Sequence, residues 1–346
     1  MQESYSISVK SKIGDSSKNE AKSKDLFLER FVSIFPVPYY WGWAIFSGIV
    51  FLCSSMLIFY LENSFSYLPS LLFLSILIAQ EASIVIWAHK KMKGLREYLL
   101  DIIDLPKDDV LRWYDNQMTI IFNELRMFAS GILVTIFVHL MGLDQFGFSF
   151  QSHYSGFIIK IDYIFAHVLM GVGLYPLICT AIMVHKIGEF PLNTNIIFSR
   201  NVHFKGLLYS KFTLCATSVY IVWGCFHLST PEKLSTPWSI AWFSFFGLLL
   251  LAYFILPQYD IHQMMIKTRK EKLGMFSSRL MTKAEEVFSS PNKENVFCLR
   301  NYLDIEHQLD DMCVWPFGSY ELLHIILIVI IPFLVVLLEI VFGILK

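Results

Sequence analysis

Five polar side chains inside apolar blocks have types that could hold a proton, an ion or a polar ligand: Gln80, Glu81, His139, Asp162 and His167. Such groups are costly at membrane depth and often functional. Glu81 lies about two helical turns from one end of its block. We predict that Glu81 either is held by a buried partner or lines a path filled with water. The sequence favours neither interpretation.

The other ionisable groups in apolar blocks lie nearer to block ends. We expect Asp162 and Glu339 to lie close enough to an interface for their carboxylates to reach water. Asp162 and His167 fall at a spacing of five, which we take as nearly one helix face. His139 and His167 are interpreted mainly as histidines whose hydrogen bonds are satisfied. In the last block, His324, Pro332 and Glu339 interrupt an almost wholly apolar run and become candidates for an ion pathway.

An acidic stretch near the C-terminus contains residue types that bind metals: Asp304, Glu306, His307, Asp310, Asp311 and Cys313. A lone acidic stretch on a helix is more often a solvated face, so no metal site is predicted. No GxSxG, HExxH or glycine-rich phosphate loop occurs. We therefore expect no enzyme activity and no cofactor.

The acidic stretch ends at Trp315, Pro316, Phe317 and Gly318, where the final apolar block follows. Proline cannot continue a helix, and glycine permits a tight reversal. Tryptophan and phenylalanine suit the depth of lipid headgroups. We predict a joint here that turns a cytoplasmic helix into the last span. It is either an interfacial anchor or a hinge that transmits movement.

The amino-acid composition indicates that these apolar blocks lie within a membrane. The chain is 55% hydrophobic and only 16% charged, whereas soluble domains carry about 25% charged residues. The net charge of -1 gives no reason to expect nucleic-acid binding. Apolar blocks of roughly 20 residues match a bilayer-crossing helix. We predict an all-α polytopic membrane protein with seven transmembrane helices, at about 41–60, 67–88, 127–146, 157–185, 210–228, 238–257 and 321–345.

Basic residues predict the orientation. Of the 28 Lys and Arg residues, 25 fall in the N-terminal tail or in connections 89–126, 186–211 and 258–319. Basic connections stay on the cytoplasmic side. We therefore expect an integral membrane protein whose N-terminus is cytoplasmic and whose C-terminus lies outside.

Four parts follow from this topology. Residues 1–35 are predicted to be a disordered cytoplasmic tail, and residues 36–257 a six-helix membrane region with a cytoplasmic helix at 89–126. In that helix, Lys107–Glu124 begins after Pro106 and continues unbroken into the third span. Residues 258–314 form a cytoplasmic helical hairpin whose first helix follows Pro257. Residues 315–346 form the joint and the seventh helix.

Glycine and proline mark one weak point in the fourth span. Gly171, Gly173 and Pro176 fall within MGVGLYPLI. This pattern predicts either a bend or a close contact with a neighbouring helix.

Roughly the C-terminal 60 residues, which include YLDIEHQLDDMCVWPFGSYELLHIILIVIIPFLVV, resemble uncharacterised prokaryotic multi-pass proteins. Those proteins end in a helix, a W-P-F joint and a span containing proline, here Pro332. The overall plan is also similar to insect odorant and gustatory receptor channels. Tyr320 matches their last-span motif, although Gln-Phe does not follow it. That resemblance implies cytoplasmic extensions that join four subunits and a last span that lines a cation pore.

We therefore expect an oligomeric, ligand-gated cation channel of three to five subunits, preferably a tetramer, with the last span lining the pore. The partners are the bilayer, other copies, and a cytoplasmic protein or small-molecule ligand. The alternatives are a non-conducting sensor or partner-recruiting module and, third, a secondary transporter that uses Glu81 and Asp162.

Overall fold

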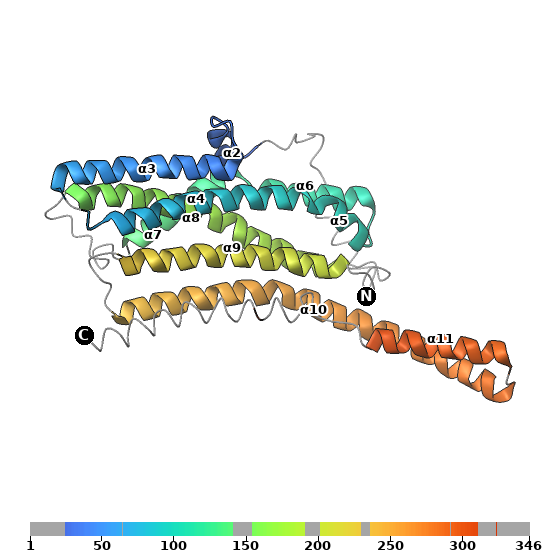
Figure 1. Ribbon diagram of the computed structural model, residues 1–346. Helices are drawn as coiled ribbons and strands as arrows, with labels where there is room; N and C mark the ends of the chain where they lie inside the picture. Colours follow the sequence, from blue (N-terminus) through green and yellow to red (C-terminus); the bar gives the residue numbers. More distant parts are fainter. Residues whose placement is uncertain are drawn as a thin grey trace.

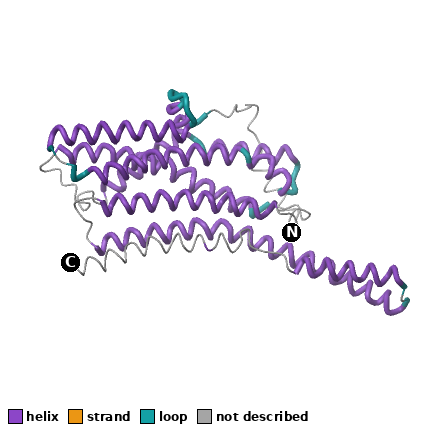
Figure 2. The backbone as a smooth tube through the Cα atoms, in the orientation of Figure 1, coloured by secondary structure: helices purple, strands orange, loops and turns teal. Residues whose placement is uncertain are grey.

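The computed structural model describes residues 25–63, 65–140, 154–190, 201–229, 236–290, 292–310 and 323. Within these ranges the chain is helical, with short turns and no β-strand (Figure 2). The helices are α2 (Phe27–Val32), α3 (Tyr39–Glu62), α4 (Leu68–Lys93), α5 (Leu95–Ile102), α6 (Lys107–Ile121), α7 (Glu124–Leu140), α8 (Tyr154–Ile187), α9 (Asn201–Ser229), α10 (Thr236–Ser289) and α11 (Lys293–Asp310).

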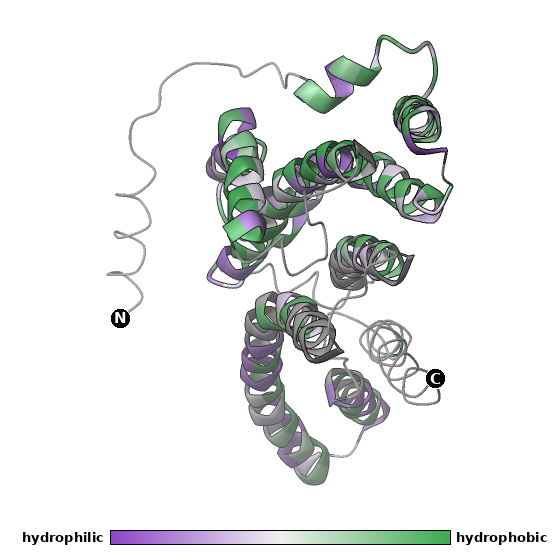
Figure 3. Ribbon diagram, turned by 90° about the vertical axis from the view of Figure 1, so that its left-hand side faces the viewer, coloured by the Kyte–Doolittle hydropathy of each residue, from purple (hydrophilic) through white to green (hydrophobic). Residues whose placement is uncertain are grey.

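Among these residues, four helical stretches are long and apolar enough to cross a bilayer: Tyr39–Glu62, Leu68–Lys93, Lys107–Leu140 and Gly156–Ile187. They coincide with the first four predicted spans. Their outward faces carry uncovered apolar side chains, such as Met56 on α3 and Leu133 on α7. Figure 3 looks along the helices and shows this hydrophobic character around the bundle. The protein is therefore an all-helical integral membrane protein.

Helix α4 is the centre of the bundle and packs against α3, α8 and α9. One row of its side chains has no exposed surface and includes Leu74, Leu77, Ile78 and Ala82. A row of this kind, at spacings of three and four residues, forms a continuous strip along a helix. Because α4 is covered on several sides, polar residues along it lie inside the protein.

Helices α7 and α8 approach each other at two glycines. A Cβ atom on Gly171 would lie 2.6 Å from the Gly131 Cα atom and 2.6 Å from the Ser130 carbonyl oxygen. Small residues allow helix backbones to touch in this way. Helix α8 continues past Pro176 to Ile187. Of the two predictions for MGVGLYPLI, the structure supports close packing at Gly171.

The predicted disordered tail is wrong at its C-terminal end. Helix α2 lies within residues 1–35 and buries Leu28 and Val32 against the bundle. The backbone N–H of Phe27 donates to Glu124 at 2.8 Å, and both guanidinium contacts of Arg30 with Glu124 are also 2.8 Å. The buried apolar side chains of α2, together with the Glu124 carboxylate at its first turn, hold this helix against the bundle.

The helix predicted to continue from the 89–126 connection into the third span is interrupted by a short turn at Phe122 and Asn123, although Lys107–Leu140 still forms one apolar stretch. Helix α6 does begin at Lys107, after Pro106, but it ends at Ile121. Asn123 then starts α7, because its side-chain oxygen accepts the N–H of Arg126 at 3.0 Å. The Tyr175 hydroxyl of α8 donates to the Ile120 carbonyl at 2.9 Å, so one carbonyl at the end of α6 has a hydrogen-bond partner.

The boundary predicted at residue 257 does not exist in the helix. Helix α10 runs without a break from Thr236 to Ser289, through Pro257. Its 54 residues correspond to a rod of about 80 Å. Figure 1 shows α10 lying beside the bundle, leaving it, and pairing with α11. The hairpin predicted at 258–314 is therefore formed by the distal part of α10 and by α11.

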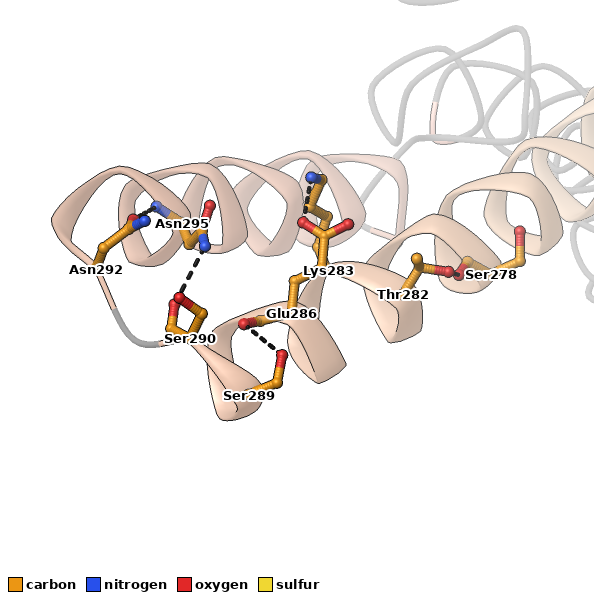
Figure 4. Close-up of polar contacts among 8 residues, drawn as sticks. All are labelled: Ser278, Thr282, Lys283, Glu286, Ser289, Ser290, Asn292 and Asn295. Atoms are coloured by element: carbon orange, nitrogen blue, oxygen red, sulfur yellow. Dashed lines mark hydrogen bonds and ion pairs between the residues drawn. The ribbon is translucent and has the colours of Figure 1, made fainter.

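The turn of this hairpin lies where Ser289, Ser290, Pro291 and Asn292 predicted it. The Asn292 side-chain oxygen accepts the N–H of Asn295 at 2.7 Å and caps α11 (Figure 4). Further along, the Phe276 and Tyr302 rings lie 6.2 Å apart, and Arg269 forms an ion pair with Asp310 at 2.5 Å. The two helices are thus joined by a cap, a ring contact and a charge pair.

Candidate functional site

The sequence singled out Gln80 and Glu81, and α4 carries both into the interface with α9. Only 4% of the Glu81 surface is exposed. Its Oε1 accepts a hydrogen bond from the Trp223 indole N–H at 3.2 Å. Within the described residues, its second oxygen, Oε2, is buried and has no hydrogen-bond donor. The sequence predicted that Glu81 either is held by a buried partner or lines a water-filled path. The arrangement fits the first prediction, with a partner for only one of the two oxygens.

Gln80 makes a similar half-satisfied contact. Its Nε2 donates to the Ser218 hydroxyl oxygen at 2.6 Å, and Ser218 in turn donates to the Cys215 carbonyl at 2.7 Å. The Gln80 side-chain oxygen is buried, again with no donor in the described part of the chain. Adjacent residues of α4 therefore each place one unsatisfied oxygen at buried positions.

An aromatic layer holds the Trp223 indole in place. The His167 ring lies 4.6 Å from the Trp223 ring and 4.1 Å from the Tyr163 ring. His167 Nδ1 lies 2.8 Å from the Tyr163 carbonyl, which can only accept, so Nδ1 carries the proton. His167 is thus satisfied, as expected, but its position between α8 and α9 also supports the donor to Glu81.

Asp162 is more buried than expected for the interfacial carboxylate that the sequence predicted. Only 8% of its surface is exposed, and its Oδ2 accepts a hydrogen bond from the Ser54 hydroxyl at 2.7 Å. Asp162 faces α3, whereas His167 faces α9. A spacing of five residues corresponds to about 140° around a helix, which separates the two faces. Asp162 and Glu81 therefore belong to different interfaces of the bundle.

His139 makes its polar contact within its own helix. It is half-buried near the end of α7, and its Nδ1 lies 2.9 Å from the Thr135 carbonyl of the same helix. This local bond agrees with the interpretation of His139 as a satisfied histidine. The structure gives it no contact with Glu81 or Asp162.

The remaining predicted residues lie outside the described ranges. These are the joint at Trp315, Pro316, Phe317 and Gly318, and the pathway candidates His324, Pro332 and Glu339. In the acidic stretch, Asp304, Glu306, His307 and Asp310 are described, whereas Asp311 and Cys313 are not. Across the described ranges, no three His, Cys, Asp or Glu side chains are placed to hold a metal ion.

A charged layer surrounds one end of the bundle. Lys90 contacts Glu29 at 2.6 Å and also lies 4.6 Å from the centre of the Tyr39 ring. Arg96 and Asp115 join the α5–α6 segment, and the Tyr114 hydroxyl donates to the Met92 carbonyl. Burial, followed by the charge of nearby Asp101, raises the pKa of Tyr98 to about 12. These contacts fix the short helices against α4.

Sequence reasoning missed the residues that complete the site: Ser54, Tyr163, Ser218 and Trp223. Ser54, Ser218 and Trp223 lie on other helices than the residues they contact, so no spacing within one segment could link them to Gln80, Glu81 or Asp162. Tyr163 directly follows Asp162, but its contact with Trp223 depends on the packing of α8 against α9. One signal was available for Trp223. It lies inside an apolar block, whereas membrane tryptophans concentrate at interfaces.

Chemically, this site offers buried oxygen acceptors and a neutral donor, without a nucleophile held next to a base. Such a site suits the binding of a positively charged or hydrogen-donating group. Comparison with protein-family models, with curated proteins and with solved structures finds no match, so the resemblances drawn from the sequence stay predictions.

Proposed function

We propose that this chain is a subunit of a homo-oligomeric, cation-conducting membrane channel. The α10–α11 hairpin joins the subunits, and the last apolar block lines the pore. One observation carries the proposal. The hairpin leaves the bundle with its apolar side chains uncovered, including Met281 (70% exposed), Phe288 (86%) and Phe297 (65%). Uncovered apolar patches mark surfaces that bind a partner.

Charge on the hairpin favours a second copy of this chain as that partner. The distal part of α10 is mainly basic, with Lys267, Arg269, Lys270, Lys272, Arg279 and Lys283. Helix α11 is mainly acidic in its second half, with Asp304, Glu306 and Asp310. Because the two helices carry opposite charge, α10 of one copy can face α11 of another. Such complementarity selects partners and orientation.

The proposed topology adds three spans to the four described above. They are α9, which contains a shorter apolar stretch at Lys211–Phe226, the first part of α10, and residues 321–345. The distribution of Lys and Arg then places the N-terminus and the hairpin in the cytoplasm and the C-terminus outside. In this arrangement water surrounds the hairpin, which strengthens the need for a protein partner.

The proposed pore follows from the character of residues 321–345. His324 and Glu339 lie near opposite ends of an apolar run that contains Pro332. An apolar wall can gate by losing water, and a ring of acidic residues at the mouth favours cations. A tetramer would place four Glu339 carboxylates around one axis.

The first test measures assembly. Native mass spectrometry of the full chain in detergent should give one closed oligomer of three to five subunits. The double variant Phe288→Ser and Phe297→Ser should give monomers, because each change removes uncovered apolar area. The matched variant Phe288→Tyr and Phe297→Tyr keeps that area and should stay oligomeric. A monomeric wild type contradicts the assembly proposal.

The second test measures conduction. The purified oligomer in a planar bilayer should show unitary cation currents, and Glu339→Gln should reduce them. Glu294→Gln, on the distant hairpin, is the matched control and should leave the currents unchanged. If an intact oligomer gives no current in the bilayer, the proposed conduction is contradicted, whereas the proposed assembly still stands.

The uncovered hairpin also favours a second function, a non-conducting module that recruits a soluble cytoplasmic protein. This function predicts a monomeric chain that co-purifies with one soluble protein. Deletion of 258–314 should abolish that co-purification. A closed homo-oligomer without a soluble partner contradicts this alternative.

A further inference from the structure

Two buried oxygen atoms of α4 have no hydrogen-bond donor in the described part of the chain: Glu81 Oε2 and Gln80 Oε1. They belong to adjacent residues whose other polar atoms both bond to α9. An unsatisfied acceptor inside a protein costs free energy, and more when it carries charge. Two such atoms at one interface call for a shared explanation.

A negative charge on Glu81 would have no positive partner among the described residues. Its single polar contact in the described residues is the neutral indole N–H of Trp223, and no basic side chain there pairs with it. A buried carboxylate without a positive partner is strongly destabilising. Asp162 differs, because the Ser54 hydroxyl donates to its Oδ2 and, in the described part of the chain, neither of its oxygens is a buried atom without a partner.

The neighbours hold both oxygens in fixed positions. Ser218 uses its proton on the Cys215 carbonyl, so its oxygen must accept from Gln80 Nε2. That bond turns the Gln80 oxygen away from Ser218. The contact between the tilted rings of Trp223 and His167 holds the indole N–H on Glu81 Oε1 and leaves Oε2 free.

We infer that the α4–α9 interface at Gln80 and Glu81 is a binding site for a compact monovalent cation. Carboxylate and amide oxygens are the ligands that hard cations prefer. One carboxylate supplies one negative charge, which matches a monovalent ion better than a divalent one. A small protonated amine offers the same charge and donates hydrogen bonds to the same oxygens. This inference does not depend on assembly or on conduction.

Thermal unfolding of the purified full chain in detergent tests it. The buffer holds ionic strength constant while N-methyl-D-glucamine chloride, whose cation is bulky, is replaced by NaCl, KCl or methylammonium chloride. A cation that binds only the folded state raises the unfolding temperature in proportion to the logarithm of its concentration above Kd. Such a rise in at least one salt is expected, and the salt that produces it identifies a metal ion or an amine as the ligand.

Glu81→Gln should change the unfolding temperature in opposite directions, relative to wild type, in the absence and in the presence of the active cation. In the N-methyl-D-glucamine buffer the variant should unfold at a higher temperature than wild type, because the uncompensated charge is gone while the acceptor for Trp223 remains. On addition of the active cation it should show no rise. Asp162→Asn removes a different buried carboxylate and should keep the full cation response.

Gln80→Met and Trp223→Phe provide further variants that keep the Glu81 charge. Loss of the amide oxygen or of the indole N–H should each weaken the apparent cation affinity roughly tenfold, as expected for one lost polar contact. A wild-type unfolding temperature that is the same in all four salts overturns the inference and indicates that Glu81 holds a proton. An unchanged cation response in Gln80→Met and Trp223→Phe also overturns it, even if Glu81→Gln does not fold.

Discussion

The bundle and the α10–α11 hairpin both display apolar side chains on their surfaces, but against different backgrounds. In the bundle, Met56 and Leu133 lie on helices long enough to cross a bilayer, so lipid can cover them. On the hairpin, Phe288 and Phe297 lie among Lys, Arg, Asp and Glu residues. The same kind of exposed residue therefore suits a lipid contact in one region, and in the other it is the basis of the proposed contact with a protein partner.

The two regions also differ in how their helices are held together. Bundle helices touch at the Gly131–Gly171 backbone contact and share a buried bond between Ser54 and Asp162. The hairpin helices share a partly exposed charge pair and the Asn292 cap. In the hairpin, a hydrogen bond from the Lys283 amine to the Glu286 carboxylate raises the pKa of that amine, and this contact lies at the surface. Substitutions in the bundle should therefore cost more stability.

Gly171→Leu should be the most damaging change. Its Cβ would overlap backbone atoms of α7, which cannot rotate away as a side chain can. We expect a loss of more than about 3 kcal/mol in the free energy of unfolding, measured by SDS titration in mixed micelles. Gly173→Ala is the control, because its Cβ would meet only Val85, at an ordinary 3.4 Å. Equal losses for both would contradict the backbone contact.

Ser54→Ala should come next. It removes the donor to the buried Asp162 carboxylate and should cost about 1 to 2 kcal/mol in the same titration. Ser47→Ala, on the same helix, is the matched control, because its buried hydroxyl bonds only to the Ala44 carbonyl of α3. A cost no greater than that of Ser47→Ala would show that the Asp162 bond adds nothing.

Glu124→Ala should release α2 from the bundle. The change removes the acceptor for the Phe27 N–H and for Arg30, but both charged side chains are largely exposed and the ion pair itself is weak. We expect a cost of about 1 kcal/mol, mostly from the lost N–H acceptor. Faster proteolysis between residues 25 and 36 is the measurement. Glu124→Gln keeps an acceptor oxygen, so cleavage of that variant at the wild-type rate is the expected control.

Asn292→Ala should have the smallest effect and a local one. Loss of the α11 cap should cost about 1 kcal/mol within the hairpin and leave the bundle unchanged. Hydrogen exchange of amides 293–300 should become faster while exchange in α4 stays constant. Ser289→Ala removes only a bond to the Glu286 carbonyl and serves as the control. Faster exchange throughout α4 would contradict the separation of the two regions.

The length of the apolar runs and the spacing of apolar residues predicted the helices well where these patterns extended over many residues. The first four spans, the α6 start after Pro106 and the hairpin turn at 289–292 follow from apolar runs, proline and polar turn residues. The breaks within helices were harder. Asn123 starts α7 and Pro257 fails to end α10, because a single capping or breaking residue competes with the packing of neighbouring helices.

Composition and local pattern alone thus established an all-helical membrane protein and named Gln80, Glu81 and Asp162 as unusual. Only the packing of α4 against α9, and of α8 against α3, decided which of their oxygens are satisfied. The reason is physical: insertion into a bilayer depends on the summed hydrophobicity of one segment, which is local. A hydrogen bond between Glu81 and Trp223 joins residues 142 positions apart, and only the folded bundle brings them together.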